Sequence, residues 1–136
     1  MKALLDVSFL IACGWQSHAR HTEARRWLEA QSSFATCPLS QLGFLRVSLS
    51  PAFRASWEDA QTVLQELLEL PGAKFITDDL ATKSLPVLSS GQDMTDAYFV
   101  ALARAHHLKL ATLDDALCKK PWAGRIALNP LVRTAT

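Results

Sequence analysis

The amino-acid sequence predicts an α/β fold, a three-layer α/β/α sandwich with a central parallel sheet, formed as a single domain over residues 1–136. Short apolar runs of strand type alternate along the chain with longer stretches whose apolar residues recur every three or four positions. Such alternation implies right-handed crossovers between parallel strands, with helices on both faces of the sheet. A chain of 136 residues with 49% hydrophobic content can bury a substantial core.

The chain opens with a short apolar run over residues 2–5, which is typical of a buried strand. Ser8 can accept a backbone hydrogen bond, so we expect it to cap a helix over 9–14. A second helix is predicted over 18–31, because its apolar residues lie on one face at helical spacing.

The next predicted strand covers 34–38 and ends at Pro38. Proline suits the first turn of a helix, and the leucines that follow Pro38 lie three and four residues apart. Ser56 and Asp59 have the spacing of a capping box, which predicts the start of a fourth helix. A Pro-Gly pair at 71–72 ends that helix.

Three further strands are predicted over residues 73–77, 109–112 and 125–129. Residues 78–90 are expected to form a short helix and a loop. Thr95 can cap a helix that runs from 96 to 107 with its alanines and Val100 facing inward.

Composition excludes several classes of protein. The net charge of +1 gives no overall attraction to nucleic acid, so any such contact must use local basic groups. The candidates are Arg20, Arg25, Arg26, Arg46 and Arg54, and a solvated surface position is the alternative for each. The three cysteines are widely separated and form no CxxC pair, so neither a zinc knuckle nor a disulfide framework is expected. No apolar run approaches the roughly 20 residues that cross a bilayer, so we expect a cytoplasmic protein with no membrane partner.

Three aspartates stand where predicted strands lead into helices. They are Asp6, Asp96 and Asp114, and no lysine is expected to compete with them nearby. Parallel sheets gather such side chains at the carboxyl ends of their strands, where a divalent cation such as Mg²⁺ offsets their repulsion. The pattern therefore indicates phosphodiester chemistry. The alternative for each aspartate, or for Asp115, is a helix cap without catalytic function.

Two segments, "LLDVSFLIA" near the N-terminus and "TDAYFVALARAHHLKLATLD" near the C-terminus, together with the chain length, resemble the PIN-domain family. The middle stretch, which includes "TCPL" and "GFLRV", is similar to a subgroup of VapC-type toxins from bacterial toxin–antitoxin pairs. The resemblance covers nearly the whole chain. It implies a metal-dependent endoribonuclease that acts as the toxin of a type II pair.

The resemblance also implies site residues. Asp6, Asp96 and Asp114 match the family's acidic residues and are the expected metal ligands for Mg²⁺ or Mn²⁺. Gln41 stands where the family usually has a glutamate, and we include it as the fourth catalytic residue. Because an amide has no negative charge, the alternative is a non-catalytic or attenuated PIN module that binds RNA or a partner.

Residues around the aspartates have expected supporting functions. Ser8 and Thr112 can donate hydrogen bonds to the carboxylates. Arg46 lies a little over one helical turn beyond Gln41, where it can contact a phosphate or form a surface ion pair.

Two other enzyme classes also place an aspartate after the first strand, but neither pattern fits. A haloacid-dehalogenase phosphatase needs a second aspartate two residues later, where this chain has Ser8. A receiver domain needs a lysine after its last strand, which "IALNP" lacks.

The resemblance further implies three partners: an RNA substrate, a cognate antitoxin and a second copy of the chain in a homodimer. We expect an antitoxin arginine to reach Asp6 and Asp96. The surface around Trp15, Trp27 and Leu28 is expected to take the antitoxin's apolar anchors.

Overall fold

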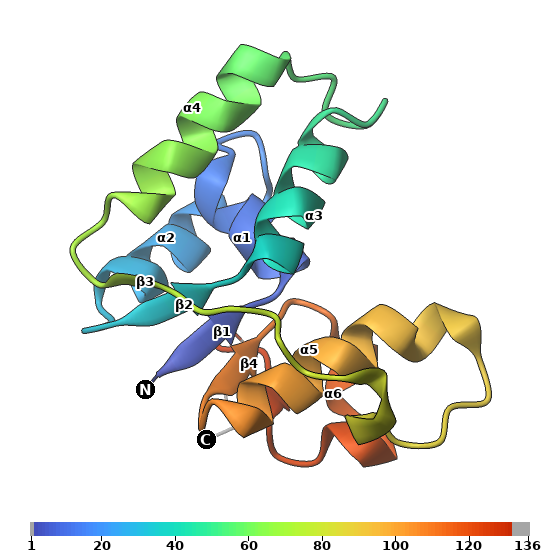
Figure 1. The fold of residues 1–136 in the computed structure, drawn as a ribbon. Helices are drawn as coiled ribbons and strands as arrows, with labels where there is room; N and C mark the ends of the chain where they lie inside the picture. Colours follow the sequence, from blue (N-terminus) through green and yellow to red (C-terminus); the bar gives the residue numbers. More distant parts are fainter. Residues whose placement is uncertain (1, 132–136) are drawn as a thin grey trace.

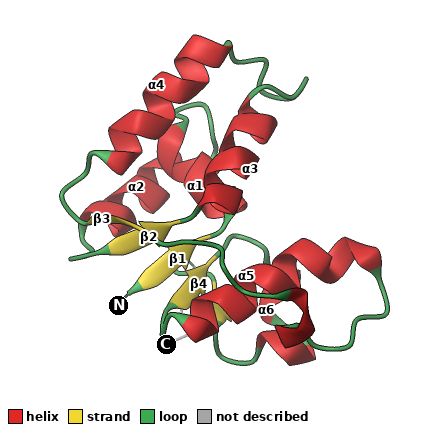
Figure 2. Ribbon diagram, in the orientation of Figure 1, coloured by secondary structure: helices red, strands yellow, loops and turns green. Residues whose placement is uncertain are grey.

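A five-stranded parallel sheet lies between two layers of helices in the computed structural model, which describes residues 2–131 (Figures 1 and 2). The strands are β1 (Ala3–Leu5), β2 (Phe34–Thr36), β3 (Ala73–Phe75), β4 (Lys109–Ala111) and β5 (Ala127–Leu128). The α-helices are α1 (Val7–Gly14), α2 (His21–Glu29), α3 (Pro38–Ser48), α4 (Trp57–Leu68), α5 (Met94–Ala105) and α6 (Asp115–Cys118). Three 3₁₀ turns are η1 (Thr82–Ser84), η2 (Gly91–Asp93) and η3 (Pro121–Ala123). The predicted α/β/α fold class is confirmed.

The strands follow the order β3-β2-β1-β4-β5, and all neighbouring strands are parallel. β1 lies at the centre, where Leu4 is in register with Ala35 of β2 and Leu110 of β4. The chain first builds the sheet outward through β2 and β3, and then returns to add β4 and β5 on the other side of β1. Such a reversal opens a crevice at the carboxyl ends of the central strands, which is where ligands bind in open α/β sheets.

Alternation along β1 divides the core between the two layers. Ala3 and Leu5 pack with α1, α2, α3 and α4, whereas Leu4 packs with residues of α5 and α6. Figure 1 shows α1 to α4 on one side of the sheet, and α5 and α6 on the other. Because both faces are covered, β1 is apolar throughout and fully buried.

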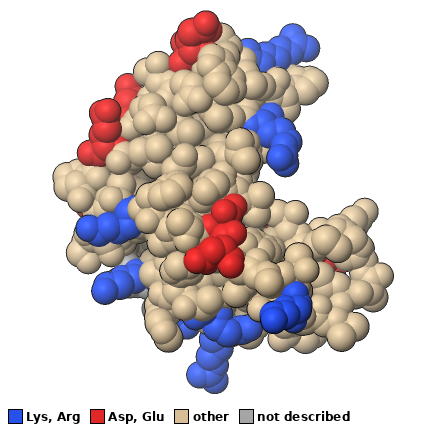
Figure 3. All heavy atoms as spheres, viewed as in Figure 1, with Lys and Arg blue, Asp and Glu red and all other residues tan. Residues whose placement is uncertain are grey.

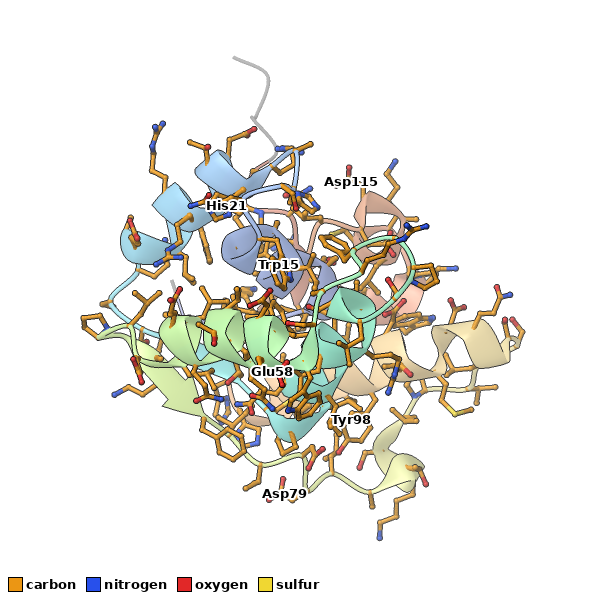
Figure 4. The ribbon with its side chains drawn as sticks, turned by 90° about the horizontal axis from the view of Figure 1, so that it is seen from above. Trp15, His21, Glu58, Asp79, Tyr98 and Asp115 are labelled. Atoms are coloured by element: carbon orange, nitrogen blue, oxygen red, sulfur yellow. The ribbon has the colours of Figure 1, made fainter. Side chains whose placement is uncertain are left out.

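The layer that contains α1 and α3 is tightly packed. A side chain at Gly43 of α3 would collide with Val7 of α1, so glycine permits the close approach of these helices. The indole of Trp15 donates a hydrogen bond to Ser48 Oγ at 2.9 Å and stacks on Phe44. Figure 4 shows Trp15 inside this layer, among α1, α3 and α4.

Trp15, Trp27 and Leu28, around which we expect the antitoxin's apolar anchors to bind, differ in exposure. Leu28 is fully buried, whereas Trp15 and Trp27 are half-buried, and Trp27 packs edge-on against Phe9 with ring centroids 5.2 Å apart. Binding of the antitoxin around the two tryptophans stays a prediction. Large exposed apolar side chains occur elsewhere in the described chain: Leu42, Leu49, Trp57, Phe75, Val87 and Met94.

Two predicted helix starts are wrong. α1 begins at Val7 with Asp6 as its N-cap, not with Ser8. α5 begins at Met94, so Thr95 lies within its first turn and does not cap it. At α1 the cap was assigned to the wrong one of two neighbouring polar residues, whereas α5 continues directly from η2 and its N-cap residue, Asp93, forms no side-chain capping hydrogen bond.

Other boundaries moved less. α2 is shorter than predicted, and residues 78–90 contain a single 3₁₀ turn, η1. α6 was not predicted, because a four-residue helix carries too little periodicity to detect. The predicted Ser56 cap is confirmed, since its hydroxyl accepts a hydrogen bond from Asp59 N–H at 3.0 Å. Across residues 2–131, no helix is both long and apolar enough to pass through a bilayer.

Candidate active site

Asp6 stands directly after β1, at the reversal of strand order. Its N–H donates to the carbonyl of Ala111 at 2.9 Å, which continues the β1–β4 pairing one residue beyond the strand. The side chain is 7% exposed. Asp6 is therefore fixed by backbone pairing on one side and by the start of α1 on the other.

The carboxylate of Asp6 accepts hydrogen bonds at both oxygens. Oδ1 accepts from Val7 N–H at 2.9 Å, as a helix cap does. Oδ2 accepts from the hydroxyl of Thr112 at 2.7 Å and, at a longer 3.5 Å, from that of Ser8. The prediction that Ser8 and Thr112 support a site carboxylate is confirmed for Asp6.

The two hydroxyls are themselves held by the backbone after β4. Ser8 Oγ accepts from Leu113 N–H at 3.1 Å, and Thr112 Oγ1 accepts from Asp114 N–H at 3.0 Å. The hydroxyl oxygens lie 3.3 Å apart. Since Thr112 is fully buried, its single proton is committed to Asp6. The network joins the ends of β1 and β4 through side chains.

Asp96 lies in the first turn of α5 and is half-buried. Burial is the main reason that its pKa is raised to about 6, and the negative charges of Asp6 and Asp114 raise it further. Burial likewise raises the pKa of Asp6, with Asp114 adding to the rise, whereas the hydrogen bonds from Thr112 and Val7 act in the opposite direction. The three predicted aspartates are therefore close enough for the charges of Asp6 and Asp114 to raise the pKa of Asp96.

Asp114 also caps a helix. Its Oδ1 accepts from Leu117 N–H at 3.1 Å at the start of α6. The cap therefore belongs to Asp114, while Asp115 accepts a hydrogen bond from the side chain of Asn129. Asp114 can cap α6 and still contribute to the site, because only Oδ1 accepts the capping hydrogen bond.

Two charged residues near the site were missed in the sequence. Asp93 adds to the negative field at Asp96, and the ammonium of Lys120 lies 3.5 Å from Asp93 Oδ2. Lys120 also lowers the pKa of Asp96, so the expectation that no lysine lies near the aspartates is wrong. Lys120 follows α6, which was not predicted, so its approach to the start of α5 could not be read from spacing.

Gln41 lies on α3 and is half-buried. Its Nε2 donates to the hydroxyl of Thr36, at the end of β2, at 3.1 Å. Within residues 2–131 it forms no hydrogen bond with the three aspartates. The structure therefore places Gln41 at the same edge of the sheet, bonded to a neighbouring strand end.

The donor chemistry of the site suits a hard divalent cation. The mutual repulsion at Asp96 marks an excess of negative charge, and aspartate oxygens are the ligands that Mg²⁺ prefers. In the described part of the chain, no group of three or more His, Cys, Asp or Glu side chains is arranged to hold a metal ion. A site with all three aspartates as direct ligands thus stays a prediction. Mg²⁺ commonly needs just one or two carboxylates, with water and substrate phosphates completing its shell.

The arginines considered in the sequence separate into two groups. Arg20 and Arg25 form exposed ion pairs with Glu23 and Glu29, which fits the solvated-surface alternative. Arg46 on α3 is exposed and, among the described residues, forms no ion pair. Figure 3 shows the surface hollowed between α3 and α5, with basic side chains above the hollow.

Comparison with known proteins identifies the family. The PIN domain matches residues 3–123. Ribonuclease VapC38 of Mycobacterium tuberculosis is 39% identical over 119 residues, which cover 82% of this chain and 84% of that protein. Ribonuclease VapC39 of the same organism is 33% identical over 136 residues, covering 93% and 98%.

Solved structures show the same fold. The crystal structure of Mycobacterium tuberculosis VapC20, described as a Sarcin-Ricin loop cleaving toxin, superimposes with a TM-score of 0.66. Its sequence is 16% identical, and the match covers 94% of this chain and 99% of that one. VapBC2 from Rickettsia felis, bound to a DNA fragment from the promoter, gives a TM-score of 0.60 at 16% identity, covering 95% and 98%.

This chain belongs to the PIN-domain family. Its relatives within that family are VapC-type, as the resemblance in the sequence implied.

Changing Asp96 to Asn should stabilise the metal-free protein near neutral pH. The folded pKa of Asp96 is above its ordinary value, so the folded state holds its proton more tightly than the unfolded state does. As pH rises from about 4 to about 6, ionisation of Asp96 should therefore lower the free energy of unfolding of the native protein. The Asp96→Asn variant has no carboxyl group at this position and should not show this decrease. After allowance for the exposed part of the side chain, we expect a gain of roughly 1 kcal/mol at pH 7.

Thermal unfolding in EDTA between pH 4 and pH 7.5 measures this difference. Asp115→Asn is the matched control, since that carboxylate lies outside the group that raises the pKa of Asp96. Equal melting temperatures for native protein and Asp96→Asn across the range would contradict repulsion at the site.

Proposed function

We propose that this protein is a metal-dependent endoribonuclease that acts in the cytoplasm as the toxin of a type II toxin–antitoxin pair. The observation that carries the proposal is the raised pKa of Asp96 beside Asp6 and Asp114, at the reversal of strand order in a PIN fold. Perturbed carboxylates in such a crevice are typical of catalytic sites. The ribonuclease names of VapC38 and VapC39 support RNA as the substrate.

Asp6 and Asp96 would hold Mg²⁺ or Mn²⁺, with Asp114 as a third ligand or as the residue that orients water. A bound cation of this kind supplies a more acidic water and neutralises charge on the phosphate. Thr112 and Ser8 hold the carboxylate of Asp6 in one orientation. Both hydroxyls donate to Oδ2, while Oδ1 accepts from Val7 N–H at the start of α1. Ligand orientation of this type commonly affects metal affinity or activity about 10- to 100-fold.

The substrate phosphate needs cationic partners as well. Lys120 lies within the field of Asp96, and Arg46 is exposed and forms no ion pair in the described chain. We propose that both attract the phosphates on either side of the cleaved bond. Because neither is locked between two carboxylates, each can turn toward RNA.

The alternative of a non-catalytic module is not favoured. Its basis was the replacement of a glutamate by Gln41, but the three aspartates still share one field at the strand ends. Gln41 bonds to Thr36, which positions its amide without adding charge.

Removing the carboxylate charge of Asp6 should abolish cleavage. Asp6→Asn keeps the shape of the side chain but loses a ligand charge, so we expect kcat to fall by at least about 100-fold. Thr112→Val should cost less, about 10- to 100-fold, because it removes an orienting hydrogen bond. Cleavage of mixed RNA with Mg²⁺ or Mn²⁺ is the measurement, and activity that persists in excess EDTA would sink the proposed mechanism.

Gln41→Glu tests whether the amide limits metal binding. A carboxylate at this position adds a negative charge at the same edge of the sheet, so half-maximal cleavage should require less Mg²⁺, by roughly tenfold. Titration of cleavage against Mg²⁺ measures the change, with Gln61→Glu on α4 as a control of equal charge. An unchanged requirement would mean that the amide is the adequate native group.

Partners form the last part of the proposal. The VapBC2 structure supports an antitoxin partner, and we propose that an arginine of the antitoxin reaches Asp6 and Asp96.

We further propose a homodimer through Leu42 on α3 and Leu49, the C-cap residue of α3, which lie about two turns apart and are 57% and 42% exposed. Light scattering should give a dimer that Leu42→Lys converts to a monomer. A native species of 15.0 kDa at micromolar concentration would contradict the dimer. Failure of the product of the neighbouring upstream gene to bind would contradict the antitoxin.

A further inference from the structure

Two adjoining hollows lie where the strands begin, at the edge of the sheet opposite the aspartates. The larger, of about 580 Å³, is lined by Lys2, Arg104, His107, Leu108, Lys109 and Ile126. The smaller, of about 210 Å³, shares Lys2 and Leu108 with it and adds Lys74 and His106. We call these two hollows together the basic groove, defined by Lys2, Lys74, Arg104, His106, His107 and Lys109.

The basic groove has almost no neutralising partners. Within residues 2–131, no Asp or Glu lines either hollow, and Lys2, Arg104 and Lys109 form no ion pair. The ammonium of Lys109 donates to the carbonyl of Arg125 at 2.8 Å, which holds it in place. His106 at the rim lies 4.0 Å from Asp79. Figure 3 shows basic side chains along this lower edge of the molecule.

His107 adds a conformational observation. Its φ of 58° places it in the left-handed region directly after α5, a position where glycine is favoured. Leu108 N–H closes the helix end on the carbonyl of Ala103 at 2.8 Å, so the turn is well formed. Glycine would form the same turn with less strain, and the imidazole instead lines the larger hollow.

The dipole of α5 does not explain the whole cluster. Basic residues at a helix C-terminus are favoured by its partial negative charge, which accounts for Arg104 and the two histidines. Lys2 and Lys109 lie at the starts of β1 and β4, and Lys74 lies on β3. Their convergence on the same groove needs a different reason.

We propose that the basic groove binds the sugar–phosphate backbone of the same RNA that is cleaved at the aspartate site, a proposal that rests on the proposed function. Lysine and arginine neutralise phosphates, while Leu108 and Ile126 offer apolar contact to the sugars. Lys2 and Asp6 flank β1 and lie four residues apart in the chain, about 13 Å at 3.3 Å per residue. An RNA that bends around the sheet can therefore contact both edges, so the groove selects long or folded RNA over short strands.

The test compares two variants that lose the same charge from exposed positions. Lys2→Ser/Arg104→Ser removes two cations from the groove, and Arg26→Ser/Lys83→Ser removes two from other surfaces. Binding of a stem-loop RNA is measured in EDTA from 50 to 200 mM salt, where metal-dependent cleavage cannot occur. The groove variant should show a salt dependence shallower by about 1.4–1.8 in log–log slope, which makes native binding fall about 7- to 12-fold more across this range. The control should match the native protein.

Cleavage then separates binding from chemistry. With Mg²⁺, the groove variant should raise KM for the stem-loop without changing kcat, and should cleave a strand of about four nucleotides as the native protein does. His107→Gly should raise the melting temperature and weaken binding of the stem-loop. A higher melting temperature with unchanged binding would remove His107 from the RNA-binding residues of the groove.

The outcomes distinguish the two proposals. If the native protein cleaves RNA and the groove variant keeps the native salt slope, the groove proposal falls while the nuclease stands. If the native protein cleaves no RNA but groove-dependent binding persists, the nuclease proposal falls, and the groove is an RNA-binding surface that serves no cleavage site. Displacement of the stem-loop by polyglutamate at lower charge concentration than by RNA would overturn the groove proposal in favour of an acidic protein partner.

Discussion

The buried carboxylate of Asp6 is the interaction on which the arrangement of the carboxyl edge depends. It ends β1, caps α1 and accepts the hydroxyl of Thr112, so one side chain joins the central strand, the first helix and the end of β4. Each bond satisfies a group that burial would otherwise leave unpaired at a cost of about 1–3 kcal/mol. The same bonds fix the direction in which Asp6 faces its neighbours.

Asp96 and Asp114 are held less tightly, and their charges remain uncompensated to different degrees. Asp6 has hydrogen bonds that oppose the effect of burial on its pKa, whereas no hydrogen bond is among the causes that set the pKa of Asp96. Local hydrogen bonds therefore stabilise the charged form of Asp6, whereas the charged form of Asp96 is opposed by burial and by the neighbouring carboxylates. Because repulsion between carboxylates is relieved by any nearby cation, the edge is arranged to bind positive charge. Lys120 supplies part of that positive charge, since its ammonium lies 3.5 Å from Asp93 Oδ2, but the pKa of Asp96 remains raised.

The sequence was sufficient for the features that depend on periodicity. Five strands, four main helices of the first layer and the positions of the aspartates at strand ends follow from apolar spacing and from the rules of parallel sheets. Thr112 was also predictable, because it immediately precedes the junction that carries Asp114. The predicted start of α1 was wrong because Asp6 and Ser8 can both cap that helix, and the start of α5 was wrong because α5 continues directly from η2 without a side-chain cap.

Features that depend on distant packing were beyond the sequence. Trp15 is half-buried because it packs on Phe44 of α3, and Trp27 on α2 is half-buried against Phe9 of α1, contacts between elements that no local pattern encodes. Lys120 reaches Asp93 because the chain turns back after β4 through α6. The basic groove likewise combines residues from the start of β1, from β3 and β4 and from the end of α5, which span the chain from Lys2 to Lys109.

A net charge of +1 conceals a strong separation of charge across the sheet. The three aspartates lie at the edge where the strands end and the basic groove at the edge where they begin, although Lys120 also places a positive charge near Asp96. A polyanion approaching this molecule meets repulsion at the aspartates and attraction at the opposite edge. On the proposed function, the cation at the aspartates and the basic groove have separate tasks: the groove gathers RNA by its backbone charge, and the cation then makes the acidic edge tolerable to one phosphate. Because the strands are short, one RNA can contact the basic groove and the cation at the aspartates together, so on the proposed function the strand length affects which RNA is bound.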